Sequence, residues 1–329
     1  MPLPLNPTHI HTTLPFYERN SALMQRLLSA EKRNQISLFM NKDAVVGYVF
    51  ALPFIIGFLS LMLIPMFMSL YYSFTNLTLG RIGHDFRGFE NYVRMWNDPR
   101  FWNSLGVTFR FVLFSVPVRM VFGLLIAYAL TRKYKGVHGY RATYYLPTLI
   151  GGSIAVALVW GQLFQRGGVI YNIFEAIGIG GIHWFGSPDL AIFPLVLMNV
   201  WQFGAAMIIF AAGIKDIPES YLEAASIDGA NKFQTFFKII LPCLSPIILY
   251  NLVMQTIAAF MTFTQAFIIT GGGPAEGTNF IALYIYNHAF SWRNMGYASA
   301  MSWILLIIVA LVTGIILKTS KRWMFSLND

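Results

Sequence analysis

The chain has 329 residues, of which 56% are hydrophobic, 16% are aromatic and only 11% are charged. This composition lies outside the range of soluble domains and indicates an integral membrane protein. The net charge of +9 does not indicate nucleic-acid binding, because the basic residues cluster beside apolar segments, where they hold topology and meet anionic lipid. The single cysteine, Cys243, excludes an intrachain disulfide and a cysteine metal cluster.

Residues 1–43 form a polar arm with a proline-rich start. A helix over residues 21–39 would place an apolar face on the inner membrane surface. A partly disordered tail is the alternative.

Six apolar stretches follow, each long enough to cross roughly 30 Å of hydrocarbon. They are residues 44–73, 107–130, 144–164, 190–214, 240–270 and 297–317. The sequence therefore predicts an all-α membrane protein with six transmembrane helices in one domain, residues 44–317, and a short tail, residues 318–329. Prolines and glycines within or beside the spans predict interrupted helices, which are typical of transporters rather than of simple anchors.

The distribution of Lys and Arg predicts that both termini lie in the cytoplasm, because positively charged loops stay inside. With this orientation, fifteen basic residues lie inside: Arg19, Arg26, Lys32, Arg33, Lys42, Arg132, Lys133, Lys135, Arg141, Lys215, Lys232, Lys238, Lys318, Lys321 and Arg322. Six lie outside: Arg81, Arg87, Arg94, Arg100, Arg166 and Arg293.

A polar segment, residues 217–242, separates the fourth and fifth spans. It predicts a short helix over 219–227, a turn at Asp228-Gly229 and a second helix over 230–240. The second helix carries three aromatic residues at spacings of three and four, which predict one shared face: Phe233, Phe236 and Phe237. A helix-turn-helix of this kind suits insertion into a cleft on another protein.

The run E-A-A-S-I-D-G-A at residues 223–230, followed by Ile240-Leu241-Pro242, resembles the EAA loop of bacterial ATP-binding-cassette importer permeases of the carbohydrate branch. The resemblance implies the type I importer permease fold and a cytoplasmic coupling helix that fits a groove on the ATPase. An ordinary amphipathic re-entry helix is the alternative. The residues that the resemblance assigns to ATPase coupling are Glu219, Glu223, Ala224, Ala225, Asp228, Gly229, Phe233 and Pro242.

The run T-G-G-G-P at residues 270–274 resembles a loop of the first-permease type found in maltose and glycerol-phosphate importers. Residues 86–101, 284–286 and 296–300 resemble further segments of this type. In Asn199-Val200-Trp201 the order resembles a segment whose Asn contacts sugar in the maltose-type permease. Gln202 and Phe203 depart from that example, which leaves the identity of the sugar open.

The sequence lacks the motifs of several other functions. It has no G-x-x-x-x-G-K-[S/T] phosphate loop, no H-E-x-x-H helix and no G-x-S-x-G elbow. The spans carry none of the acidic or histidine residues that couple ion flow in secondary transporters. We therefore expect no catalytic residue, no metal site and no cofactor on this chain, with ATP and Mg²⁺ bound by partner ATPases.

A sugar path needs uncharged polar and aromatic groups from several helices, because hydroxyl-rich ligands are held by amide hydrogen bonds and ring stacking. Arg119 lies deep in the second span and is expected to face a partner subunit or the path. Each polar group could instead serve interhelical hydrogen bonding. The candidate path residues are Asn199, Trp201, Gln202, Asn251, Gln255, Thr262, Gln265 and Arg119.

These observations predict a permease subunit in the bacterial inner membrane that imports a carbohydrate. The expected partners are a second permease, two ATPases, an extracytoplasmic sugar-binding protein and membrane lipid. The ligand stays open among a neutral oligosaccharide, a polyol, glycerol phosphate and an acidic oligosaccharide such as an alginate fragment. The alternative function is a self-sufficient channel or facilitator whose inner loop is only structural.

Overall fold

The computed structural model describes residues 42–131, 136–178 and 181–324. The predicted helix of the N-terminal arm, the basic residues at 132, 133 and 135 and the last five residues of the tail lie outside this described part. The chain divides into two compact units, residues 1–68 and residues 69–329.

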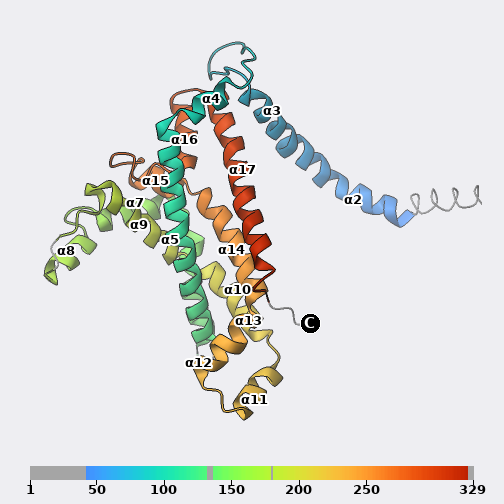
Figure 1. Ribbon diagram of the computed structural model, residues 1–329, viewed down its shortest axis with the longest axis vertical. Helices are drawn as coiled ribbons and strands as arrows, with labels where there is room; N and C mark the ends of the chain where they lie inside the picture. The colour runs from blue at the N-terminus through green and yellow to red at the C-terminus, as the bar shows by residue number, and fades with distance from the viewer. Residues whose placement is uncertain (1–41, 132–135, 179–180, 325–329) are drawn as a thin grey trace, which may run out of the picture. The chain divides into compact units, whose positions relative to one another are not determined.

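The described part of the chain is helical, and Figure 1 shows the elements in order. They are α2 (Lys42–Phe58), η1 (Leu59–Leu63), α3 (Ile64–Ser73), α4 (Glu90–Trp96), α5 (Pro99–Leu130), α6 (Val137–Ile150), α7 (Ile154–Phe164), α8 (Val169–Ala176), η2 (Trp184–Gly186), α9 (Pro188–Trp201), α10 (Gly204–Lys215), α11 (Glu219–Ile227), α12 (Lys232–Thr235), η3 (Phe236–Ile240), α13 (Leu241–Cys243), α14 (Ser245–Phe260), α15 (Thr264–Ile269), α16 (Ile281–Tyr286), η4 (Asn287–Ser291) and α17 (Met295–Ser320). Within the described ranges no β-strand forms. Two isolated bridges pair Thr75 with Phe86 and Thr78 with Asn294.

The predicted spans correspond to four helices long and apolar enough to cross a membrane and to two bent helix pairs. The four helices are Val45–Ser73, Pro99–Leu130, Ser245–Ile269 and Met295–Ser320. The pairs are Gly139–Ile150 with Ile154–Ala176, bent by 97°, and Pro188–Trp201 with Gly204–Lys215, bent by 43°. If each bent pair counts as one span, the six predicted spans are all present, and the third and fourth are interrupted as the glycines indicated.

The second span begins earlier than the hydropathy pattern predicted. Asp98 caps the N-terminus of α5 by accepting a hydrogen bond from the backbone N–H of Arg100 at 3.0 Å, and Pro99 occupies the first turn. An acidic cap and a proline at this position favour helix initiation whatever the polarity of the following residues. The helix therefore starts eight residues before the predicted residue 107.

The described part of the first unit is a single run of helix with an apolar surface. None of residues 45–68 is buried, although aromatic and aliphatic side chains are abundant there. A helix that is apolar all round and unburied suits contact with lipid or with another membrane subunit.

The core of the second unit forms around α5, which packs against α9, α10, α14 and α16. Its fully buried side chains include Phe111, Leu195, Met207 and Phe280. A second cluster, around Phe260, Tyr297 and Met301, joins α14, α16 and α17 near the start of α5. Long-range packing of this kind holds the polar groups described below at defined positions.

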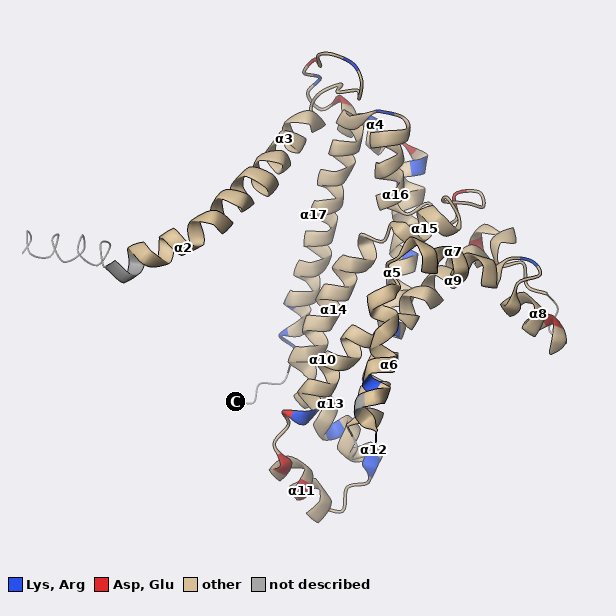
Figure 2. Cartoon of the chain, turned by 180° about the vertical axis from the view of Figure 1, so that it is seen from behind, with Lys and Arg blue, Asp and Glu red and all other residues tan. Residues whose placement is uncertain are grey.

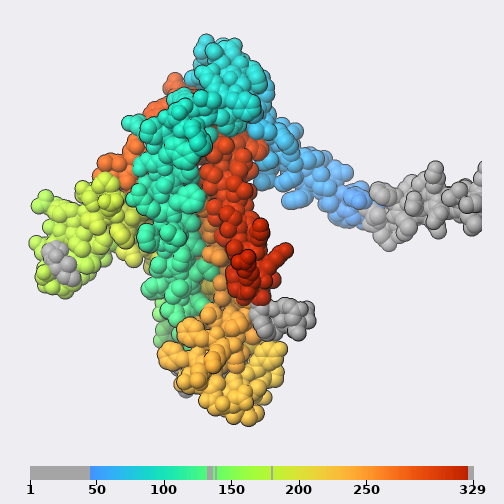
Figure 3. All heavy atoms as spheres, viewed as in Figure 1, coloured from blue at the N-terminus to red at the C-terminus, as the bar shows by residue number. Residues whose placement is uncertain are grey.

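The two ends of the second unit differ in what they carry. The segment α4, the element α16 and the start of α17 lie together at one end, and α11 and α12 lie at the other (Figure 1). Figure 2 shows Lys, Arg, Asp and Glu gathered mainly toward these ends, with the middle of the long helices largely uncharged. In the space-filling view the α11–α12 segment, in yellow and orange, forms the surface of its end (Figure 3).

Candidate functional site

The docking segment, defined here as residues 217–242, begins with α11 and a tight turn. The N–H of Gly229 donates to the carbonyl of Ser226 at 3.1 Å, and the N–H of Ala230 donates to that of Ala225 at 2.9 Å. This pair of bonds is a Schellman motif. Gly229 has φ +74°, a left-handed conformation in which a β-carbon is unfavourable. The bounds of α11 and the turn at Asp228-Gly229 agree with the sequence prediction.

The second helix of the segment starts two residues later than predicted. Asn231 and Gln234 form a capping box, in which the N–H of Gln234 donates to Asn231 Oδ1 at 2.9 Å and the N–H of Asn231 donates to Gln234 Oε1 at 2.8 Å. This reciprocal pair satisfies two backbone donors at a helix start. The helix therefore begins at Lys232 as α12 and continues as a π-helical turn, η3.

The base of the docking segment is packed into the transmembrane bundle. Phe236 is buried with Ile217, Ile240 and Leu244, and its ring lies 4.8 Å from that of Tyr128 in α5. Both strands of the connection, the one entering α11 and the one leaving η3, are thus held by one apolar cluster. A force applied to the tip is transmitted to α5 and α14 through close-packed side chains.

The tip of the segment is exposed and partly apolar. Ile227 is 85% exposed and Phe233 is 78% exposed, and Glu223 and Ala224 are also exposed. Ala225, in contrast, is only 4% exposed and faces the interior of the chain. Exposed apolar side chains grouped on a charged helical tip mark a protein contact surface.

The prediction that three phenylalanines share one face is wrong. Phe236 is buried, whereas Phe233 and Phe237 are exposed. The physical reason is the π-helical turn at η3, because a wider turn changes the angle between residues three and four apart. Only Phe236 anchors the segment, and the other two rings stay on its surface.

A second group of predicted residues meets at the break between α9 and α10. The Nη2 group of Arg119 donates to the carbonyl oxygen of Gln202 at 2.6 Å, and Thr148 Oγ1 donates to the same oxygen at 3.1 Å. Arg119 Nη1 lies 3.5 Å from Asn199 Oδ1. Three predicted path residues, Asn199, Gln202 and Arg119, are therefore together. Arg119 binds a helix break of its own chain, a role that sequence reasoning did not consider.

Glycines make this break possible. A β-carbon on Gly204 would lie 2.6 Å from the carbonyl oxygen of Tyr144, and one on Gly151 would lie 2.4 Å from the Gln202 side chain. Both contacts are shorter than any stable packing distance, so α6 and α10 approach closely only because the side chain is absent. The predicted weak points in the spans thus serve as contact points.

The remaining candidates do not join this group through described hydrogen bonds. The ring of Trp201 lies 5.5 Å from that of Trp160 in α7. Asn251 donates to the carbonyl of Ile247 in its own helix at 3.1 Å. Gln255 is buried, and its amide has no hydrogen-bond partner among the described residues. Thr262 is also buried, and Gln265 is half-buried.

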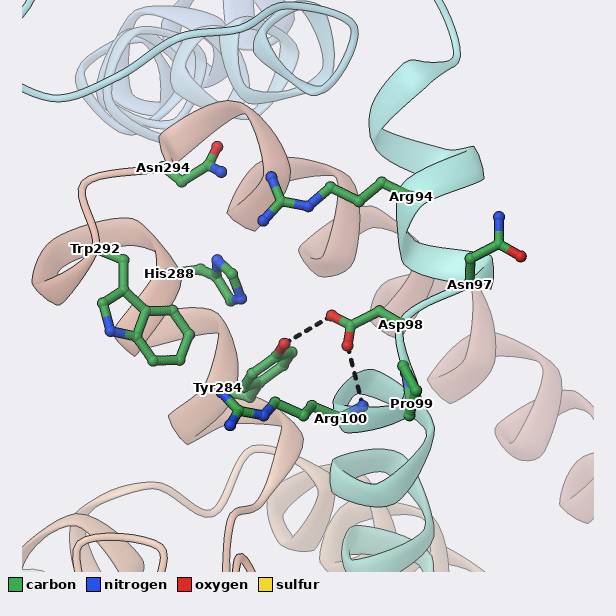
Figure 4. Close-up of a pocket in the computed structure, with 9 residues that line it drawn as sticks. All are labelled: Arg94, Asn97, Asp98, Pro99, Arg100, Tyr284, His288, Trp292 and Asn294. Atoms are coloured by element: carbon green, nitrogen blue, oxygen red, sulfur yellow. Dashed lines mark hydrogen bonds between the residues drawn. The ribbon is translucent and has the colours of Figure 1, made fainter.

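Sequence reasoning missed a polar pocket at the opposite end of the second unit from the docking segment. It has a volume of about 650 Å³ and is shown in Figure 4. Its lining residues are Arg94, Asn97, Asp98, Pro99, Arg100, Tyr284, His288, Trp292 and Asn294. The segments 86–101 and 284–286 had been singled out only for their resemblance, and their meeting in space has no local sequence signal.

Asp98 organises this pocket. Its Oδ2 accepts hydrogen bonds from the hydroxyls of Tyr284 at 2.6 Å and Tyr297 at 2.7 Å. Burial alone would raise the pKa of Asp98, but these hydrogen bonds hold its pKa below the ordinary value. Burial and the bond to Asp98 raise the pKa of Tyr284. Asp98 is therefore a carboxylate at neutral pH, and both phenols remain protonated donors.

His288 is a buried and neutral member of the pocket. Burial, together with the positive charges of Arg94 and Arg100, lowers its pKa to about 4. Neither ring nitrogen has a hydrogen-bond partner among the described residues. Elsewhere in the described ranges, no group of three or more His, Cys, Asp or Glu side chains is placed to hold a metal ion.

A bundle of interrupted apolar spans that carries a firmly packed and exposed helical segment at one end is the architecture of a transporter membrane subunit. Residues 44–325 match the family described as "Binding-protein-dependent transport system inner membrane component". The chain belongs to this family. It is a multi-pass permease subunit and not an enzyme.

Curated relatives and solved structures agree with this membership. The chain is 51% identical over 288 residues to "Probable ABC transporter permease protein YesP" of Bacillus subtilis, covering 86% of this chain and 93% of that protein. It is 36% identical over 263 residues to "Multiple sugar-binding transport system permease protein MsmF" of Streptococcus mutans, covering 79% and 89%. A chain of a bacterial alginate ABC transporter, solved with an alginate-bound periplasmic protein, shares the fold with a TM-score of 0.73 at 23% identity, covering 85% of this chain and 96% of that one.

Proposed function

We propose that this chain is one of two permease subunits that together form the path of an ATP-driven carbohydrate importer in the bacterial inner membrane. Membership of the family over residues 44–325 carries the proposal. Relatives that share 30% or more of their residues with the chain include permeases named for sugar-binding, starch-product, trehalose/maltose and lactose transport systems. Two cytoplasmic ATPases and an extracytoplasmic sugar-binding protein complete the proposed importer.

In this proposal the docking segment transmits ATPase movement to the membrane. Glu223 would anchor the tip through a charge-assisted hydrogen bond. Ala224 would allow close approach, while the exposed Ile227 and Phe233 would enter an apolar groove of the ATPase. Because Phe236 is packed into the bundle, movement of the tip would shift α5 and α14 as a body. A differential fit of the segment to open and closed ATPase dimers would couple the two equilibria.

The sugar path is proposed to pass the break between α9 and α10. Asn199 lies on the last turn of α9, and residues 204–215 form α10 below it. Twelve helical residues at 1.5 Å each put this break roughly 18 Å from the end that carries the docking segment. Gln255 in α14 has an unpaired buried amide, which is the group expected where a hydroxyl-rich ligand binds.

The proposed topology places both termini and the docking segment in the cytoplasm. It rests on the excess of Lys and Arg on that side of the spans. The pocket around Asp98 then lies at the outer end, where a binding protein would deliver the sugar. Attachment of a reporter enzyme after Ser320 should show the C-terminus to be cytoplasmic.

Reconstitution tests the proposal directly. The chain, coexpressed with the adjacent transport genes of its source, should copurify with a different six-span protein and with ATPase subunits. In proteoliposomes this complex should accumulate a carbohydrate only with internal ATP and external binding protein. Uptake without ATP or without an ATPase partner would establish a channel or facilitator and would refute the importer.

A further inference from the structure

The pocket around Asp98 has spare hydrogen-bond donors and no spare acid. Asp98 is fully used, because Oδ2 accepts from two tyrosines and Oδ1 accepts from the N–H of Arg100. Asn294 Oδ1 accepts from the N–H of Tyr297 at 3.3 Å, which leaves its Nδ2 donors unused. The pocket is therefore prepared for a ligand that brings acceptors.

Two arginines give the pocket its charge. Arg100 Nε is paired with Glu276 at 3.2 Å. Arg94 has no acidic partner among the described residues, and its guanidinium carbon lies 4.3 Å above the Tyr297 ring. Stacking of this kind fixes the plane of a guanidinium and leaves its edge free for a bidentate acceptor. Arg94 is thus an oriented and unneutralised cation at the pocket.

The aromatic side of the pocket consists of Trp292 and His288. Their ring centroids are 4.4 Å apart, and His288 also contacts the rings of Tyr284 and Tyr297 at 4.7 Å each. His288 is only 5% exposed, and both of its nitrogens lack a partner. Trp292 is half-exposed and offers a ring face. Figure 4 shows both rings on the side of the pocket that lies across from Asn97 and Pro99.

We propose that this pocket binds an acidic sugar through its carboxylate. Arg94 would take the carboxylate on the free edge of its guanidinium, and Trp292 would stack on the sugar ring. Asn294 Nδ2 and the unpaired His288 nitrogens would receive ring hydroxyls. This inference rests on the proposed sugar transport and adds a substrate class to it, a uronic acid residue held at the outer end before it enters the membrane.

The size and chemistry of the pocket favour a sugar over an acidic side chain of a docked protein. A volume of about 650 Å³ falls in the range of small-molecule sites and exceeds what one Asp or Glu would fill. An aromatic face beside amide donors suits a ring that bears hydroxyls. A neutral sugar would leave the charge of Arg94 unanswered, so the pocket should discriminate in favour of the uronate.

Titration calorimetry on the assembled complex in lipid nanodiscs tests this inference. The probes are methyl α-galacturonate and, as the neutral match, methyl α-galactoside. The galacturonate should bind saturably and at least tenfold more tightly than the galactoside. Arg94→Gln should weaken galacturonate binding at least tenfold, and Trp292→Ala should weaken it too. Arg166→Gln removes an exposed arginine outside the pocket and should leave binding unchanged.

Several outcomes would overturn the inference. These are no saturable galacturonate binding, equal binding of the two glycosides, or unaltered binding by Arg94→Gln in a complex that purifies and melts like the wild type. If Arg94→Gln fails to assemble, Trp292→Ala decides. Loss of binding-protein association without any loss of galacturonate binding would assign the pocket to protein docking. Binding needs neither ATP nor transport, so ATP-dependent uptake of another sugar would preserve the proposed function while this inference failed.

Discussion

Arg119 in α5 donates a hydrogen bond at 2.6 Å to the carbonyl oxygen of Gln202, which lies in the break between α9 and α10. A carbonyl freed from a helix inside a membrane has no water to bind, and leaving it unpaired costs free energy. Thr148 supplies a second donor to the same oxygen. The broken span is thus stabilised by two neighbouring helices.

Replacing Arg119 by Leu should destabilise the complex by about 2 kcal/mol, the usual contribution of a hydrogen bond from a charged donor. Thr148→Val removes the weaker donor and should cost about 1 kcal/mol. The double variant should lose more than the sum, because the Gln202 carbonyl is then unpaired. Thermal unfolding of the purified complex measures these effects. An unchanged midpoint for both single variants would contradict this role.

Replacing Gly229 by Val should uncouple ATP use from transport. A β-branched residue at φ +74° is strained by on the order of 1–3 kcal/mol, which would distort the Schellman turn and the tip beyond it. ATP-dependent uptake in proteoliposomes should fall strongly while the protein still reaches the membrane. Glu223→Ala should weaken ATPase association in pull-down.

The matched control is Gly167→Val, because Gly167 has a similar φ of +78° in the connection between α7 and α8. It imposes the same backbone strain away from the docking segment and should leave coupling intact. Normal uptake by both the Gly229 and Glu223 variants would argue against the proposed ATPase contact.

Replacing Asn199 by Ala should lower sugar uptake several-fold, as expected for the loss of one amide hydrogen bond worth about 1 kcal/mol. Gln255→Leu should act in the same direction, although removal of an unpaired buried amide should also raise thermal stability. ATPase activity without binding protein should stay near the wild-type value in both variants. Asn172→Ala, on the exposed helix α8, serves as the control. Wild-type uptake and sugar preference in both test variants would place the path elsewhere.

The buried His288 should make stability depend on pH. Its folded-state pKa of about 4 lies below its ordinary value of 6.5, so the unfolded state takes up the proton first as the pH falls. The contribution of neutral His288 is therefore complete above pH 6.5 and is lost progressively between pH 6.5 and about 4. The groups that set this shift are Arg94, Arg100 and Asp98. The pKa of Asp98 is lowered from an ordinary value of 3.8, so its own contribution is lost only below this window.

The melting temperature of the wild-type complex should thus fall from pH 7.5 to pH 5. His288→Phe keeps an aromatic ring in the cluster, removes the titrating group and should show a smaller fall. His84 is exposed and lies in an outer loop, so His84→Phe should keep the wild-type slope. Equal slopes for the wild type and His288→Phe would show that His288 does not titrate as described.

Local sequence features predicted much of the fold and half of the candidate site. Apolar length located the six spans, because a helix must be long enough to cross the hydrocarbon and its backbone is satisfied within the helix. The bounds of α11 and the turn at Gly229 were also predictable, because helix caps and left-handed turns depend on adjacent residues. The start of α5 was missed because the Asp98 cap outweighed the hydropathy pattern.

The tertiary structure alone decided which polar groups meet. Tyr284 and Tyr297 reach Asp98 across 186 and 199 residues of chain, and Arg119 reaches Gln202 across 83. The π-helical turn at η3, which buries Phe236 and exposes Phe233, likewise follows from packing on α5. Apolar length and turn chemistry act between neighbouring residues and can be read along the chain. Pairings between distant polar groups depend on how the helices pack, and no residue carries that information by itself.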